Sequence, residues 1–166
     1  MKFFLIGLPG SGKTTLGKQL AEKMKLPFVD LDLEIEKTEG KTIQEIFAEK
    51  KENYFREMES KTLKKFCSTK TDFVMATGGG APCFFNNMEV MNHAGKTIFL
   101  DVPASEIALR LQKTNLTERP LFSKLSSEQL KDKIEWLRSQ RIHFYRQSNI
   151  VILENSLDEI LRKIKD

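Results

Sequence analysis

Short runs of apolar residues alternate along the chain with longer segments in which apolar residues recur every three or four positions. A short, continuous apolar run is typical of a strand buried on both faces, and the longer spacing is typical of an amphipathic helix. Strands that alternate with helices indicate an α/β fold, in which helices cover both faces of a parallel sheet. The pattern predicts strands at 3–6, 27–30, 73–76, 97–100 and 149–153, and helices at 13–24, 34–66 (broken near Gly40), 104–112, 126–145 and 157–165.

Residues 7–14 match the pattern G-x-x-x-x-G-K-[ST], directly after a predicted buried strand and directly before a predicted helix. Glycines let the backbone curl so that its N–H groups point at a phosphate, and the helix N-terminus adds the positive end of its dipole. Lys13 would supply charge to the β- and γ-phosphates, and the Thr14 hydroxyl is a candidate Mg²⁺ ligand. We therefore expect a nucleoside triphosphate to bind here, with contacts from Gly10, Ser11, Gly12, Lys13, Thr14 and Thr15.

Two aspartates, Asp30 and Asp32, stand at the end of the second predicted strand. In an extended chain, residues two positions apart point the same way, and open α/β folds bind ligands at the carboxyl edge of the sheet. Two carboxylates at this edge could serve Mg²⁺ and the hydroxyl of an acceptor. The alternative is a pair of solvated turn residues, one of which caps the next helix.

Two further features lie in the middle of the chain. Arg56 and Glu59 are three residues apart and share one face of a predicted helix, although an ordinary surface ion pair would have the same spacing. A run of glycines, Gly78, Gly79 and Gly80, follows the third predicted strand. Such a run has no side-chain wall and lets a ligand approach the backbone closely, whereas the alternative is a plain flexible turn.

Two arginines in the last third of the chain are candidates for binding anions. Arg119 lies with Pro120 in a polar segment at 114–124, and an arginine on a mobile loop could close over a transferring phosphoryl group. Arg141 occupies an inward position on the long predicted helix, where a charge needs a partner such as a bound carboxylate or a structural ion pair. The apolar stripe that contains this position is formed by Leu130, Ile134, Leu137 and Phe144.

The composition is that of an ordinary globular domain, with 40% hydrophobic and 30% charged residues in a chain of 166. The formal net charge is +4 without a block of like charges, which gives little support to a nucleic-acid or membrane partner. Cys67 and Cys83 have no metal-ligand spacing, so a reducing cytoplasm is the simplest setting. The apolar run at 3–8 is too short for a signal peptide. The absence of a heptad seam favours a monomer.

In this order, and along nearly the whole chain, the motifs resemble those of the shikimate kinase family. Many kinases share the P-loop, whereas the ordered set is far more specific. The resemblance rests on the P-loop at 7–14, Asp30 and Asp32, Phe55-Arg56 with Glu59, Gly78-Gly79-Gly80, Arg119-Pro120-Leu121, and Arg141 ahead of Tyr145.

The resemblance implies a P-loop NTPase with the three-layer fold of the nucleoside monophosphate kinases and a five-stranded parallel sheet. It implies one kinase domain over 1–166, with a helical shikimate-binding insert at about 33–61 and a lid at about 112–124. The reaction would transfer the γ-phosphoryl group of ATP to the 3-hydroxyl of shikimate, with Mg²⁺, in chorismate and aromatic amino-acid biosynthesis.

The resemblance also implies roles on the acceptor side. Asp32 would contact the acceptor hydroxyl as a catalytic residue. Arg56 and Arg141 would grip the shikimate carboxylate, and Glu59 would orient Arg56. The backbone at Gly79, within the run of Gly78, Gly79 and Gly80, would complete the substrate site.

On the nucleotide side, the resemblance implies that Lys13 and the lid residue Arg119 act on the transferring phosphoryl group. Asp30 would support Mg²⁺ through water, beside Thr14. Arg110 is a candidate for stacking on adenine.

The chain departs from the family pattern in a few places. The family run Arg-x-Pro-Leu-Tyr is Arg141-Ile142-His143-Phe144-Tyr145 here, which keeps the arginine and the tyrosine, and Pro82 after the glycines is unusual. The segment between Arg110 and Arg119 is about one residue longer than the resemblance leads us to expect. The alternatives are another P-loop kinase, for gluconate or a nucleoside monophosphate, and a nucleotide-binding module without catalysis. The acceptor-side motifs argue against both.

Overall fold

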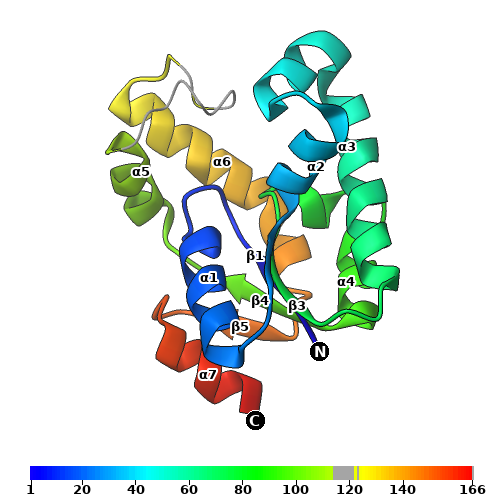
Figure 1. Ribbon diagram of the computed structural model, residues 1–166. Helices are drawn as coiled ribbons and strands as arrows, with labels where there is room; N and C mark the ends of the chain where they lie inside the picture. Colours follow the sequence, from blue (N-terminus) through cyan, green and yellow to red (C-terminus); the bar gives the residue numbers. More distant parts are fainter. Residues whose placement is uncertain (114–121, 123, 166) are drawn as a thin grey trace.

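The computed structural model describes residues 1–113, 122 and 124–165, and its elements form a sheet flanked by helices (Figure 1). The sheet has five strands in the order β2-β3-β1-β4-β5, and every neighbouring pair is parallel. The predicted α/β fold with a five-stranded parallel sheet is therefore confirmed. The strands are β1 Lys2–Ile6, β2 Phe28–Asp30, β3 Phe73–Ala76, β4 Lys96–Leu100 and β5 Ile150–Ile152.

Helices cover both faces of this sheet, and alternate residues of β1 divide the core between them. Phe3 and Leu5 pack in one apolar cluster with α1 and α7, whereas Phe4 and Ile6 belong to a second cluster with α2 to α6. Because successive side chains of a strand point to opposite faces, these clusters are the two halves of a three-layer core. The helices are α1 Lys13–Met24, α2 Leu31–Glu39, α3 Ile43–Ser68, α4 Asn87–Ala94, α5 Ala104–Gln112, α6 Ser127–Tyr145 and α7 Leu157–Lys165.

The turn from β2 into α2 differs from the extended conformation that we expected. The strand ends at Asp30, and the helix begins at Leu31 rather than near Glu34. The side chain of Asp30 accepts hydrogen bonds from the backbone N–H groups of Asp32 (3.1 Å) and Leu33 (3.4 Å). Asp30 is thus the helix N-cap, and this satisfies N–H groups that an uncapped helix start leaves unbonded. Asp32 lies in the first turn of α2, not on an extended strand.

Two local features were not predicted from the apolar pattern. The chain after the glycine run forms a short 3₁₀ helix, η1 Ala81–Cys83, and then α4. The long helix α3 continues to Ser68 and contains a non-helical residue, Lys51, with φ of 66°. A capping box lies at the start of α3, because the side chains of Thr42 and Glu45 bind each other's backbone N–H groups.

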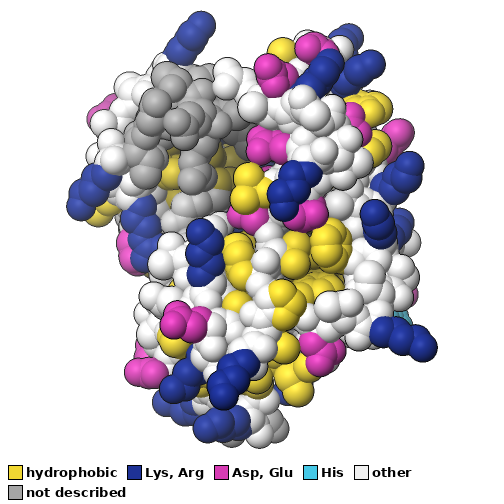
Figure 2. Space-filling model, in the orientation of Figure 1, with side chains coloured by type: hydrophobic (Ala, Val, Ile, Leu, Met, Phe, Trp, Pro, Cys, Tyr) yellow, Lys and Arg dark blue, Asp and Glu magenta, His cyan; other side chains and the backbone are white. Residues whose placement is uncertain are grey.

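The fold gathers the P-loop, the start of α2 and the glycine run at one edge of the sheet. The P-loop follows the central strand β1, and β3 leads into Gly78 beside it. This carboxyl edge is where open α/β sheets bind ligands. Among the described helices, none has the length and apolar character needed to cross a membrane. Acidic and basic side chains are interspersed over the face shown in Figure 2.

Candidate active site

A cavity of about 990 Å³ lies at the carboxyl edge of the sheet. The P-loop, the start of α2, the inner face of α3, the glycine run, α5 and α6 all contribute to its wall. The structure therefore brings almost all the predicted site residues to one place. Those that line the cavity are Gly10, Gly12, Lys13, Thr14, Thr15, Asp30, Asp32, Arg56, Glu59, Gly78, Gly79, Gly80, Arg110 and Arg141.

Two predicted residues fall outside this set. Ser11 is fully buried in the P-loop and does not line the cavity, and its hydroxyl has no hydrogen-bond partner within the described part of the chain. Arg119, with most of the expected lid, lies outside the described residues. Phe122, also in the expected lid, is described; it is buried and lines the cavity.

The P-loop wraps around the start of α1 in the conformation that glycines allow. Gly10 and Gly12 have φ of 82° and 93°, in the region that other residues rarely adopt. The ammonium group of Lys13 donates to the carbonyl oxygens of Gly7 and Leu8, each at 2.9 Å. The lysine thus lies against its own loop, beside the N-terminus of α1, where an anion would be stabilised by the helix dipole.

Thr14 and Asp30 form a pair of oxygen ligands next to the P-loop. The Thr14 hydroxyl donates to Asp30 Oδ2 at 3.3 Å, while the other oxygen of Asp30 caps α2. A hydroxyl and a carboxylate are hard oxygen donors, which suit Mg²⁺. The pair therefore fits the ligand chemistry of a magnesium ion, which these two side chains would hold.

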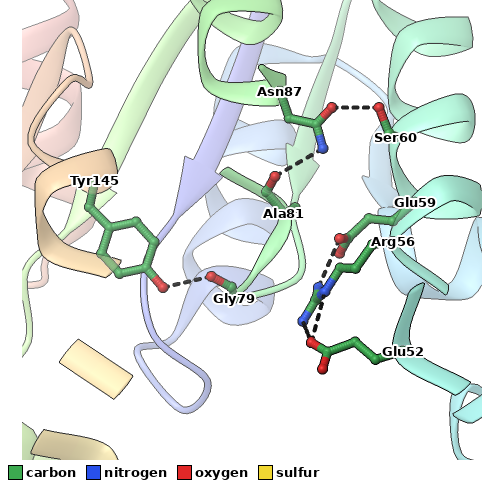
Figure 3. A network of polar contacts seen from close by, with 8 residues as sticks. All are labelled: Glu52, Arg56, Glu59, Ser60, Gly79, Ala81, Asn87 and Tyr145. Carbon is green, nitrogen blue, oxygen red and sulfur yellow. Dashed lines mark hydrogen bonds and ion pairs between the residues drawn. The ribbon is translucent and has the colours of Figure 1, made fainter. Parts of the chain in front are cut away.

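Arg56 and Glu59 form a buried ion pair on the inner face of α3, not the surface pair that was the alternative (Figure 3). Arg56 Nη1 donates to Glu59 Oε2 at 2.8 Å, and both side chains are almost completely excluded from solvent. The exposed carboxylate of Glu52 lies 3.3 Å from Arg56 Nη2. The guanidinium also stands over the Phe84 ring, 4.6 Å from its centroid. These contacts fix its plane at the cavity wall.

Unpartnered oxygens of Asp32 and Glu59 meet at the glycine run. Asp32 Oδ1 and Glu59 Oε1 are buried and have no hydrogen-bond partner within the described residues. A Cβ atom added to Gly78 would lie 2.6 Å from Glu59 Oε1 and 3.1 Å from Asp32 Oδ1. Glycine is therefore required there for the two carboxylates to approach the backbone, and both carboxylates retain acceptor capacity for a ligand.

Arg141 supplies a matching donor on the opposite side of the glycine run. Its side chain is buried on the inward face of α6, as the apolar stripe predicted. Its Nη1 has no hydrogen-bond acceptor within the described part of the chain. A Cβ atom added to Gly79 would lie 3.2 Å from that nitrogen and 2.7 Å from Pro9 Cδ, so Gly79 is enclosed between Arg141 and the P-loop.

The electrostatics of the cavity shift the pKa values of two of its carboxyl groups, Asp32 and Glu59. Burial, reinforced by the Asp30 carboxylate, raises the pKa of Asp32 to about 6, although Lys13 and Arg56 oppose the shift. Burial also raises the pKa of Glu59 above its usual range, and the guanidinium of Arg56 opposes it. Buried carboxyl groups with raised pKa values in a cleft are typical of functional sites.

Arg110 lies at the edge of the P-loop, on α5. Its Nη1 donates to the Gly10 carbonyl at 3.4 Å, and its guanidinium also pairs with Glu106. The side-chain amide of Asn155 lies beside the same guanidinium. The amide nitrogen donates to Ser11 O at 3.2 Å, and the amide oxygen accepts from Arg110 Nη2 at 3.0 Å. Sequence reasoning missed Asn155, because a lone asparagine before the last helix has no motif around it.

The comparisons with known proteins agree with this geometry. The sequence model of the shikimate kinase family matches residues 9–166. The chain is 42% identical to a shikimate kinase of Bacteroides fragilis over 159 residues, which is 96% of this chain and 88% of that protein.

Two solved structures are similar over nearly their whole length. The crystal structure of shikimate kinase from Bacteroides thetaiotaomicron has a TM-score of 0.89 and 38% identity, and the match covers 99% of this chain and 94% of that chain. Shikimate kinase from Acinetobacter baumannii in complex with shikimate has a TM-score of 0.89 and 33% identity, with 99% and 92% covered. The protein therefore belongs to the shikimate kinase family.

Proposed function

We propose that this protein is an ATP-dependent shikimate kinase, which transfers the γ-phosphoryl group of ATP to the 3-hydroxyl of shikimate. The products would be shikimate 3-phosphate and ADP, on the route to chorismate and the aromatic amino acids. Membership of the family and the complex of the Acinetobacter baumannii relative with shikimate support this substrate.

One observation supports the proposal most strongly. Within the described residues, the cavity wall presents buried hydrogen-bond acceptors without partners, from Asp32 and Glu59, and a buried donor without a partner, from Arg141, around a backbone without side chains. Buried polar groups that lack partners cost free energy, about 1–3 kcal/mol each, unless a ligand satisfies them. A substrate that carries both hydroxyls and a carboxylate would supply hydrogen-bond partners for all three of these side chains.

The acceptor side of the site divides into two roles. Arg56 and Arg141 bind the carboxylate, because planar guanidinium groups match its geometry, and Glu59 orients Arg56. The N–H groups of Gly79 and Gly80 add donors that no side chain obstructs. Asp32 accepts a hydrogen bond from the 3-hydroxyl, aligns it for attack on the γ-phosphorus and takes its proton late in the transfer.

The nucleotide side binds ATP and neutralises the charge of the transferring group. The P-loop N–H groups from Gly10 to Thr15 surround the phosphates, and Lys13 leaves its own carbonyl partners to bind the β- and γ-phosphates. Arg119, from a lid over about 112–124, adds positive charge at the γ-phosphate, and Arg110 lies against adenine. Mg²⁺, when bound at Thr14 and Asp30, would neutralise phosphate charge and hold the β- and γ-oxygens in place.

We also propose the domain organisation, oligomeric state, location and partners of the protein. We expect one kinase domain over 1–166, in which the helices over about 33–61 form the acceptor-binding insert. We also expect a cytoplasmic monomer whose partners are ATP and shikimate, with neither nucleic acid nor membrane involved.

The experiment that tests the proposal measures ADP release by the purified full chain with Mg²⁺ and ATP. Shikimate, gluconate and a set of nucleoside monophosphates are compared as acceptors, and a reaction without acceptor gives the background. We expect release that depends on shikimate and exceeds every other acceptor by at least about a hundredfold in kcat/KM, because the wrong acceptors leave buried groups unpaired. Release that gluconate or a nucleotide supports equally well would contradict the proposal.

Replacing Asp30 by Asn should weaken the use of Mg²⁺ without harming the fold. Asparagine caps a helix as well as aspartate does, so α2 keeps its N-cap, but the charge beside Thr14 is lost. We expect the Mg²⁺ concentration for half-maximal activity to rise about five- to tenfold, since carboxylate charge contributes to the affinity of the site. The measurement is ADP release against free Mg²⁺ at fixed ATP. Glu34→Gln, in the same helical turn, is the control and should leave the Mg²⁺ dependence unchanged; equal behaviour of the two variants would refute the role of Asp30.

Replacing Gly80 by Ala should disturb the acceptor site through Arg56 alone. The backbone of Gly80 has φ of −88°, which alanine adopts easily, but its new Cβ would lie 2.5 Å from Arg56 Nη2. The guanidinium must therefore move away from the cavity wall. We expect the KM for shikimate to rise about tenfold, the equivalent of one hydrogen bond to a charged group, with the KM for ATP nearly unchanged. The melting temperature should fall, because moving the guanidinium weakens its buried ion pair with Glu59. Steady-state kinetics and thermal unfolding check this, and a KM for shikimate equal to that of the native protein would contradict it.

A further inference from the structure

The glycine run is held by two buried side chains that are not part of the cavity wall (Figure 3). The Tyr145 hydroxyl, from the end of α6, donates to the carbonyl oxygen of Gly79 at 2.6 Å. The amide nitrogen of Asn87, from the start of α4, donates to the carbonyl oxygen of Ala81 at 2.9 Å. Backbone N–H groups of Ala81 and Cys83 donate to Gly78 O (3.1 Å) and Gly80 O (2.9 Å). Among the described residues, Tyr145 is therefore the donor that fixes the remaining glycine carbonyl, that of Gly79.

Tyr145 is well suited to hold one backbone position. Its side chain is fully buried, and its ring packs against Phe99 with 5.0 Å between the ring centroids. Burial raises the pKa of Tyr145, so the hydroxyl keeps its proton and acts as a donor at every physiological pH. A buried hydroxyl needs an acceptor, and Gly79 O supplies it.

Asn87 secures the other end of the segment independently. It is fully buried, and its side-chain oxygen accepts a hydrogen bond from the Ser60 hydroxyl of α3 at 2.8 Å. Both ends of the amide are therefore bonded, one to α3 and one to Ala81. Loss of the Tyr145 contact would release the Gly79 carbonyl, while the backbone bonds to Gly78 O and Gly80 O and the Asn87 bond to Ala81 O would remain.

The position of Tyr145 links the glycine run to the acceptor-binding arginines. Tyr145 follows Arg141 by four residues on α6, one helical turn further along the same buried face. Gly79, which Tyr145 holds, lies between the Arg141 guanidinium and Pro9 of the P-loop. The hydroxyl thus fixes the Gly79 peptide relative to both the acceptor and the nucleotide sides. Within the described part of the chain, the N–H groups of Gly79 and Gly80 donate to no other acceptor.

We propose that Tyr145 is a positioning residue, whose hydrogen bond to Gly79 O fixes the peptide plane between Gly79 and Gly80 and so aims the N–H group of Gly80 at the carboxylate of the acceptor. This inference rests on the proposed function for the identity of that carboxylate. Tyr145 does not touch the acceptor itself. Its hydrogen bond orders the glycine run before the acceptor binds, so binding does not have to lose that conformational freedom. Its contribution therefore belongs to acceptor binding rather than to phosphoryl transfer.

The test is Tyr145→Phe, which removes one hydroxyl and keeps the ring against Phe99. We expect the KM for shikimate to rise about five- to twentyfold, on the scale of one hydrogen bond and the ordering it provides. The KM for ATP should stay within about twofold and kcat within about threefold, because neither depends on the Gly79 peptide in this account. The control is Ser139→Ala, which removes a hydroxyl from the same helix; Ser139 Oγ donates to Trp136 O at 2.7 Å and is not part of the cavity wall. It should leave all three constants unchanged.

A second readout does not depend on the substrate. In ¹⁵N relaxation measurements without ligands, the order parameter of the Gly80 N–H, which shares a peptide plane with Gly79 O, should fall from the rigid value of about 0.85 towards 0.6 in Tyr145→Phe, while that of Ala81 stays rigid. An unchanged order parameter at Gly80, a KM for shikimate within about twofold of the native value, or equal increases in both KM values would each overturn the inference. If the native protein shows no shikimate-dependent turnover, the proposed function fails, and the relaxation data alone decide whether Tyr145 orders the glycine run.

Discussion

Replacing Asp32 by Asn should lower kcat for shikimate phosphorylation by about 10²- to 10⁴-fold, the range for loss of a positioned acid–base group. The expected cause is local. Within the described residues, Asp32 has a buried oxygen without a hydrogen-bond partner at the glycine run, and asparagine keeps its shape but cannot take a proton. Binding of ATP should change much less than turnover, because the P-loop binds phosphates through its backbone N–H groups and Lys13, and Asp32 acts on the loop through the charge of Lys13. Single-turnover kinetics with a calorimetric titration of a non-hydrolysable ATP analogue separate the two effects.

The same substitution should increase the stability of the fold at neutral and alkaline pH. The folded-state pKa of Asp32 is raised from 3.8 to about 6, so ionisation of this buried carboxyl opposes folding. The stabilising effect of the protonated form is complete below about pH 4 and is lost as pH rises through 6. We expect Asp32→Asn to be more stable than the native protein by about 1–3 kcal/mol at pH 8 and to show little difference at pH 4.

Denaturant titrations at these two pH values measure the stability difference directly. Burial is the largest cause of the raised pKa of Asp32; Asp30 and Glu36 raise it further, and Lys13 and Arg56 lower it. At each pH, the free energy of unfolding of Asp32→Asn is compared with that of the native protein. If the advantage of the variant is smaller at pH 8 than at pH 4, the raised pKa of Asp32 is contradicted. A variant with near-native turnover would contradict the catalytic role of Asp32, whatever its stability.

Replacing Arg56 by Lys should raise the KM for shikimate by about 10- to 100-fold, the cost of losing charge-assisted hydrogen bonds to a carboxylate. Lysine keeps the charge beside Glu59 but has no planar fork, so it cannot hold both Glu59 and the acceptor in place. The substitution also removes the stacking of the guanidinium on Phe84. The KM for ATP should remain near the native value, because Arg56 lies on the acceptor side of the cavity.

The matched control for this prediction is Arg138→Lys on α6, where the guanidinium pairs with Asp101 at 2.7 Å and is not part of the cavity wall. It makes the same chemical change at a partly buried ion pair outside the site. We expect it to leave both KM values unchanged. If Arg56→Lys behaves like this control, the proposed clamp on the carboxylate is wrong.

The parts of the fold that follow from burial could be predicted from the sequence. The strands are short apolar runs, since both faces of the sheet are covered, and the P-loop glycines mark the turn after β1. Arg141 could be placed on the inward face of α6 because its neighbours in the stripe are apolar, and its burial confirms this. The burial of the Arg56–Glu59 pair did not follow from spacing alone, since exposed pairs have the same spacing.

The parts that depend on backbone and polar contacts could not be read in the same way. Helix α4 was missed because it begins after left-handed residues at Phe85 and Asn86 and buries the polar side chain of Asn87 in its first turn. The start of α2 was placed too late, because an N-cap at the last strand residue leaves no loop between β2 and the helix. The bond between Tyr145 and Gly79 joins residues 66 positions apart, which no local pattern indicates.

The most direct test of the central claim is to identify the phosphorylated product by ¹H–³¹P correlation NMR. The purified full chain is incubated with Mg²⁺, ATP and shikimate, and the position of the phosphate is read from its coupling to the ring protons. The account predicts one new phosphate ester, at the 3-hydroxyl, formed in equal amount with ADP. A phosphate at another hydroxyl, or ADP formation without any shikimate ester, would contradict it.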